Sequence, residues 1–110
     1  EGEVGWSAAM ALARLGDSGG RTVLMDMLDR KFWEDGERFE KVDESGAVHR
    51  YPMPPQRVEA LLIAAIDAAS HLPDQALWDA IETLKSDPIP SVRMKAADVA
   101  SRRTASAAKG

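Results

Sequence analysis

Three short segments of the chain resemble one another and fall into one register: residues 4–9, 56–61 and 92–97. Each has an alanine at its fifth position, and the last two segments start 36 residues apart. The first two start 52 residues apart, an interval that becomes comparable once an insertion of about 15 to 20 residues is set aside. A period in the thirties with two helices per unit is typical of an α-solenoid, whose stacked helical pairs bury a shared core. The sequence therefore predicts an all-α fold.

Apolar residues recur at the spacing of an α-helix in five segments, which make about two and a half helical pairs. These segments are about 3–15, a second that follows 17–20 and reaches Phe32, then 56–71, 74–84 and 91–103. We expect one domain over residues 1–104, followed by a disordered tail over 105–110. Because the chain opens without a methionine, we also expect it to be part of a longer protein.

The first and third helices have the most informative patterns. The first carries two apolar stripes, which predict that neighbouring helices cover it on two sides. The stripes are Val4, Ala8, Ala11, Leu12 and Leu15, and Trp6, Met10 and Ala13. The third helix is apolar nearly all round, so we expect it to be the central one, with Ala64 at a tightly packed midpoint.

Residues 33–55 interrupt the helical pattern. Within them, two short segments of alternating character flank the turn residues Asp43-Glu44-Ser45-Gly46. This pattern predicts an inserted β-hairpin at about 37–51 with a four-residue loop. Most of its side chains are charged, so we expect the hairpin to project from the helices.

Two segments resemble a known family of helical repeats. Residues 8–17, with the sequence Ala-Ala-Met-Ala-Leu-Ala-Arg-Leu-Gly-Asp, resemble the second helix and linker of a HEAT repeat, most closely the phycobilisome-lyase type. Residues 87–93, followed by Ala96-Ala97, resemble the turn and second helix of another unit. The resemblance implies a short armadillo-like α-solenoid, and the inserted hairpin lies outside the family pattern.

Composition excludes several kinds of site. The chain has no cysteine, which excludes disulfides and thiolate metal sites, and its histidines, His49 and His71, lack partners at ligand spacing. No phosphate-binding loop or nucleophile motif is present. The formal net charge of −4 argues against nucleic-acid binding, and the longest apolar run is too short for membrane insertion. We therefore expect no enzymatic activity, no cofactor and no metal within these residues.

The aromatic residues around the insertion allow two interpretations. Trp33, Phe39 and Tyr51, with Arg50 beside them, could attach the hairpin to the helices or could form a patch that binds a partner. The acidic residues of 34–44 are usual for a solvated face; if they bind a partner, it should be basic. Trp6 and Trp78, by contrast, lie among small apolar residues and are expected in the core.

The resemblance also suggests a structural role for three charged residues. In the repeat pattern Asp87 and Arg93 would tie the turn of one unit to the helix of the next, and Arg57 would occupy the matching position in an earlier unit. Arginine suits such a role because its guanidinium binds a carboxylate through two hydrogen bonds.

Taken together, these patterns favour a non-catalytic scaffold for protein–protein interaction, with an unidentified protein partner. The alternative is an accessory helical-repeat region of a larger enzyme, such as a hydrolase or a bilin-lyase-like protein. Exposed ends of the repeat stack could also let copies of the chain associate. The sequence leaves the cellular compartment open.

Overall fold

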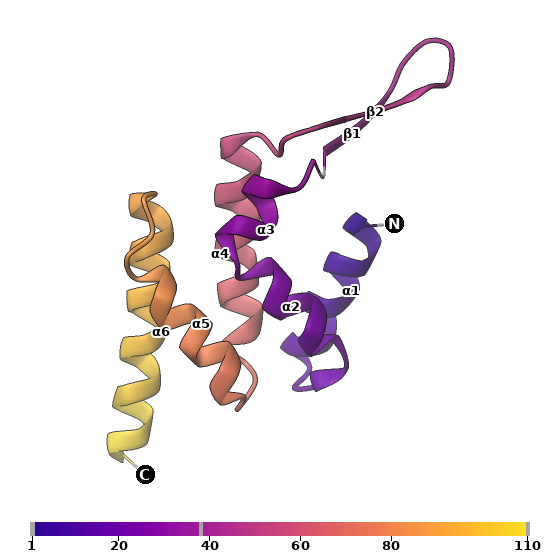
Figure 1. The fold of residues 1–110 in the computed structure, drawn as a ribbon. Helices are drawn as coiled ribbons and strands as arrows, with labels where there is room; N and C mark the ends of the chain where they lie inside the picture. Colours follow the sequence, from indigo (N-terminus) through magenta and orange to yellow (C-terminus); the bar gives the residue numbers. More distant parts are fainter. Residues whose placement is uncertain (1, 38, 110) are drawn as a thin grey trace.

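The computed structural model describes residues 2–37 and 39–109, which form helices and one small sheet (Figure 1). In chain order the elements are α1 (Gly2–Arg14), the 3-10 turn η1 (Ser18–Gly20), α2 (Arg21–Met27), α3 (Arg30–Asp35), β1 (Phe39–Val42), β2 (Val48–Tyr51), α4 (Pro55–Ala69), α5 (Gln75–Leu84) and α6 (Pro90–Lys109). The predicted helical character and the predicted hairpin are thus both present.

The helices form two layers. In one layer α1, α4 and α6 lie side by side, so the three segments that share a sequence register are neighbours (Figure 1). In the other, α2 lies against α1 and α4, while α5 lies against α6 and contacts both α2 and α4. The body is therefore thin, and the sheet projects from one end of it (Figure 1).

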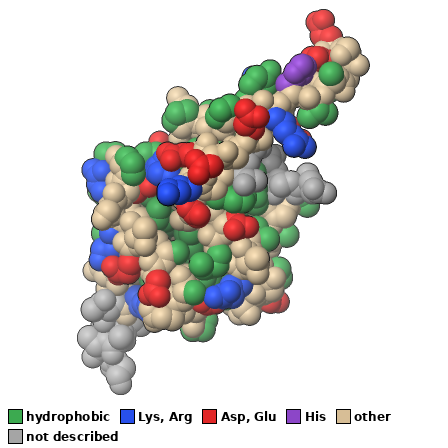
Figure 2. All heavy atoms as spheres, viewed as in Figure 1, with side chains coloured by type: hydrophobic (Ala, Val, Ile, Leu, Met, Phe, Trp, Pro, Cys, Tyr) green, Lys and Arg blue, Asp and Glu red, His purple; other side chains and the backbone are tan. Residues whose placement is uncertain are grey.

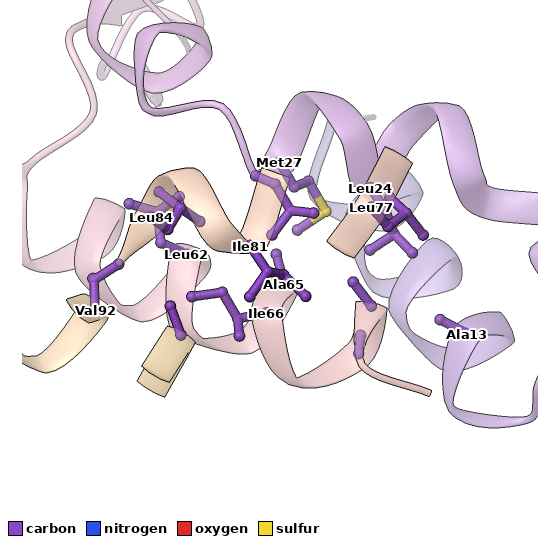
Figure 3. Close-up of a cluster of buried hydrophobic side chains, with 14 of the residues drawn as sticks. Ala13, Leu24, Met27, Leu62, Ala65, Ile66, Leu77, Ile81, Leu84 and Val92 are labelled. Carbon is purple, nitrogen blue, oxygen red and sulfur yellow. The ribbon is translucent and has the colours of Figure 1, made fainter. Parts of the chain in front are cut away.

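One apolar core joins the two layers. Leu24, Leu62, Ile66, Leu77 and Ile81 are fully buried and come from α2, α4 and α5 (Figure 3). Trp6 and Trp78 are also buried, as the sequence predicted. The third predicted helix is indeed central, because α4 contacts every other α-helix; its fully buried midpoint is Ala65, however, and Ala64 is only half-buried.

The second predicted helix is two helices. The chain turns at Leu28 and Asp29, where the Asp29 carboxylate accepts a hydrogen bond from the Lys31 amide and caps α3. An aspartate that binds the backbone in this way competes with helix continuation, which explains the break. The turn reorients α3 so that its Trp33 points back to the end of α2, where the indole Nε1 donates to the Met27 carbonyl at 2.9 Å.

Only one of the two predicted stripes of α1 is covered. Trp6, Ala9 and Ala13 are buried against the body, whereas Val4 and Leu15 are 74% and 83% exposed. The expectation of neighbours on both sides of α1 is therefore wrong within the described residues, because α1 forms one end of its layer. The other end differs as well: α6 continues to Lys109, where the sequence predicted a disordered tail, and residue 110 lies outside the described residues.

The close contact between α1 and the following turn depends on a glycine. Gly20 is buried, and a Cβ atom there would lie 2.6 Å from the Ala9 Cα and 2.7 Å from its Cβ. Both are separations that backbone movement would have to relieve. Gly5 is the opposite case, since a Cβ there would meet nothing within 4 Å.

We predict that Gly20→Ala lowers the free energy of unfolding by about 1–3 kcal/mol, because it forces α1 and η1 apart. Gly5→Ala is the matched control and should raise that free energy by about 0.5–1 kcal/mol, because it removes a glycine from an open helical position. Urea denaturation followed by circular dichroism measures both. Equal effects of the two substitutions would show that α1 does not pack on Gly20.

Candidate functional site

The hairpin is an arm that stands clear of the helical body. Its antiparallel strands pair Phe39 with Tyr51 and Val42 with Val48, and neither strand has a backbone contact with a helix. Figure 2 shows hydrophobic, acidic, basic and histidine side chains exposed along this arm. Because successive residues of a strand face opposite sides, the Val42–Val48 pair and the Phe39–Tyr51 pair lie on different faces.

The tip of the arm is organised by one carboxylate. Asp43 accepts hydrogen bonds from the Ser45 amide and hydroxyl and from the Ala47 amide, and its second oxygen lies 2.6 Å from the His49 Nε2. The hydrogen bonds from Ser45 and His49 lower the pKa of Asp43 to about 2. Gly46 completes the turn with a φ of 87°, which a side chain would disfavour. The carboxylate thus stays charged, and keeps the turn bonded, in mildly acidic solution.

The predicted partner-binding residues lie in different environments. Trp33 is fully buried, with ring contacts to Trp6 and Phe32, so it is a core residue that no partner can touch in this conformation. Phe39 is half-buried and packs against the core at the base of the arm. Tyr51 remains exposed beside it. The aromatic residues therefore divide between anchoring the arm and facing solvent.

The arm also exposes a valine pair that the sequence analysis did not single out. Val42 and Val48 are directly opposite each other and are 67% and 57% exposed. On the same face, Arg50 Nε donates to Glu40 Oε2 at 3.1 Å. The alternation of the two strands, combined with the hairpin register, could have placed these four residues together.

A buried ion pair joins two parts of the helical body that are far apart in the sequence. The side chain of Asp87 is 2% exposed and accepts two hydrogen bonds from Arg30, from Nε and Nη2, each 2.6 Å long. The two residues are 57 positions apart, and the pair joins the start of α3 to the turn before α6. A second Asp87 contact caps that turn, since Oδ2 accepts from the Ile89 amide at 2.9 Å.

Arg93 was expected to help tie this turn to a helix, but it does not bind the Asp87 carboxylate. Arg93 does lie at the same turn, but its Nη1 donates to the backbone carbonyls of Asp87 and Pro88. Arg30 is the carboxylate's guanidinium partner, and no local sequence signal identifies it because the contact is tertiary. Arg57 is exposed on α4 and lines a hollow of about 370 Å³ between α1 and α4.

The electrostatics of this pair follow from its burial. Desolvation alone would raise the pKa of Asp87, but the hydrogen bonds from Arg30 and Ile89 and the nearby positive charge outweigh it and lower that pKa. The Asp87 carboxylate in turn raises the pKa of Arg30. Both groups are therefore charged across the physiological range, and each satisfies the other.

A groove of about 590 Å³ lies beside the ion pair. Its lining includes apolar residues of α2 and α5 and charged residues of α3: Met25, Leu28, Ala80, Leu84, Lys31 and Glu34. Because Arg30 and Asp87 bind each other there, the groove offers a mainly apolar surface.

The structure contains a repeated motif that the sequence analysis missed. Asp29–Trp33 and Asp74–Trp78 each place an N-capping aspartate four residues before a tryptophan. Each indole donates to a carbonyl six residues earlier, of Met27 at 2.9 Å and of Leu72 at 3.0 Å. The spacing Asp-x-x-x-Trp, found twice at an interval of 45 residues, is the signal that could have revealed it.

Residues 2–37 and 39–109 hold no group of three or more metal-ligating side chains, and His49 and His71 lie on the arm and at the end of α4. The helices so described include none that is long and apolar enough to cross a membrane. No family model, curated protein or solved structure matches the chain.

We predict that Arg30→Met lowers the free energy of unfolding by about 3 kcal/mol, because it leaves the Asp87 carboxylate buried without its partner. Adding Asp87→Asn should recover part of this loss, since the amide can still cap the turn without a charge. Urea denaturation of the two variants and the parent tests this non-additivity. A double variant less stable than Arg30→Met would contradict it.

The pH dependence provides a check on the same pair. Because folding lowers the pKa of Asp87, its contribution to stability is present above the carboxyl's ordinary pKa and is lost as the pH falls through the folded value. Asp87→Asn should therefore flatten the acid limb of the stability profile.

Proposed function

We propose that the chain is a non-catalytic protein-interaction module, in which HEAT-like helical pairs hold the β-hairpin as a recognition arm. The layer of α1, α4 and α6, covered by α2 and α5, supports the repeat arrangement. The observation that carries the proposal is the arm itself: an ordered hairpin, free of backbone contacts with the body, that exposes Val42 and Val48.

The helices fix the base of the arm on both sides. Before it, α3 is held by the buried Trp33 and by the Arg30–Asp87 pair. After it, Met53 is buried and α4 begins at Pro55 within the central layer. A recognition element on rigid supports loses less entropy on binding than a free loop does.

The charges of the arm narrow the kind of partner. Glu40 is paired with Arg50, and the Asp43 carboxylate is bound within the turn by Ser45, Ala47 and His49, so neither acidic side chain is free to bind a basic partner. Val42, Val48 and Tyr51 remain exposed to solvent, although each pairs with a residue on the opposite strand. We therefore expect a protein partner that presents an apolar strip.

The edges of the arm are poorly suited to pairing with a second copy. Two-fold antiparallel pairing of β1 strands through their centres would place Glu40 opposite Glu40, or Lys41 opposite Lys41, of the other copy. The same pairing of β2 strands would oppose His49 with itself or Arg50 with itself. Like charges directly opposite destabilise a sheet, so the faces of the arm are the better contact surface.

Site-specific photo-crosslinking in the cell of origin tests the proposal. A crosslinking residue in place of Val42 should give a discrete adduct with another protein, and one in place of Ser101, exposed on α6, should not. Adding Val48→Ser should remove the adduct, because it replaces the other half of the apolar pair.

A variant without the arm provides the folding control. Replacing residues 40–50 with a short Gly-Ser linker keeps Phe39, which packs against the core, and should leave the helical circular dichroism nearly unchanged, because the strands have no backbone contacts with the helices. Loss of helicity would make the arm a structural brace. If the same adduct forms from both crosslinker positions, or persists with Val48→Ser, the partner binds the helices and not the arm.

A further inference from the structure

The uncovered face of α1 has the pattern of a helix–helix interface. We call Val4, Ala8, Ala11 and Leu15 the outer stripe; all four are exposed, and their spacing of four, three and four residues is that of a packed helical seam. Leu15 follows the last residue of α1, but its amide still donates to the Ala11 carbonyl, so the stripe continues through the end of the helix. The buried stripe of the same helix, by contrast, packs on the body.

The two ends of the layer differ in character. At the far end, the exposed face of α6 carries Met94 and Ala97 among polar residues, with Asp98 and Arg102 in an ion pair. A polar outer face is what terminates a helical stack in water. Over its described side chains, up to Arg103, the outer face of α6 is therefore mostly polar, whereas the α1 end exposes two large apolar side chains with small ones between them.

We infer that two copies of the chain pair through the outer stripe, with their α1 helices antiparallel about a two-fold axis. The axis passes between Ala8 and Ala11, so Val4 lies opposite Leu15 and Ala8 lies opposite Ala11 of the other copy. A head-to-tail contact between the outer stripe and α6 fits less well, because it would cover the Asp98–Arg102 pair.

Size and charge make the outer stripe complementary to itself. The alanines allow the helix axes to approach where they cross, and the larger residues fill the space that opens on either side. The residues that flank the stripe are Gly5, Ser7, Leu12 and Arg14. Arg14 lies 3.8 Å from Asp67 of its own chain, and in the antiparallel register it is far from the Arg14 of the other copy, so among the described side chains of α1 the pairing opposes no like charges. The antiparallel helix dipoles add to this fit.

The contact is small for a dimer. One pair of short helices buries less than the ~1,600 Å² of a standard interface, so we expect a reversible dimer with a dissociation constant in the micromolar range. This inference is independent of the arm: failure of the dimer would leave the proposed recognition by Val42 and Val48 standing, and the reverse also holds.

Sedimentation equilibrium from low micromolar to submillimolar concentration measures the association. The parent chain should show a monomer–dimer equilibrium that Ala8→Glu weakens at least tenfold. Ala97→Glu is the matched control: it places the same side chain on an exposed helical position of α6 and should leave the equilibrium unchanged. Circular dichroism confirms that both variants keep the parent's helicity.

A pair of variants tests the register. Chains carrying Ala8→Glu and chains carrying Ala11→Lys should each be weakened alone, but their mixture should form a heterodimer because the new charges face each other. A mixture of Ala8→Glu with Ala8→Lys should recover less, since those positions are not opposite. A parent that stays monomeric, a dimer that Ala97→Glu weakens as much as Ala8→Glu, or equal recovery in both mixtures would overturn the inference.

Discussion

The buried pair between Arg30 and Asp87 is the constraint on which the arrangement of this molecule depends. It joins α3 to the turn before α6, so the arm, α4 and α5 all lie within the loop of chain that it closes. Removing two charges from water is costly, and here the cost is offset by two short hydrogen bonds in a fixed geometry. The contact therefore specifies how α3 lies against the turn before α6, while the apolar core supplies the bulk of the stability.

Aspartates also set the local course of the chain. Five turns begin with an aspartate that accepts a hydrogen bond from the amide two residues later: Asp17, Asp29, Asp43, Asp74 and Asp87. Such turns are determined by neighbouring residues alone, which is why most element boundaries could be predicted from the sequence. The same chemistry serves both the helical turns and the tip of the arm.

The failures of sequence reasoning have a common physical origin in tertiary packing. The two stripes of α1 are similarly apolar, and nothing local shows that Trp6 faces the body while Leu15 faces solvent. Likewise Asp87 and Arg93 were expected to tie the turn of one unit to the helix of the next, but the fold brings Arg30 to Asp87 across 57 positions. Trp33 was grouped with the aromatic residues around the hairpin as a possible binding residue, yet the turn at Asp29 directs it into the core. The hairpin, in contrast, was predicted from residues close in sequence, although Val42 pairs with Val48, so the connection spans the five residues 43–47 and not the four expected.

The proposed recognition arm requires a rigid helical body and a hairpin that opens independently of it. Native-state hydrogen exchange measures this separation directly, because an isolated two-stranded hairpin is marginally stable in water whereas core helices open only by global unfolding. The amides of β1 and β2 should exchange through local opening at rates that added denaturant barely changes, while those of α4 should follow the global free energy of unfolding. Equal protection of arm and α4, with the same denaturant dependence, would contradict the account.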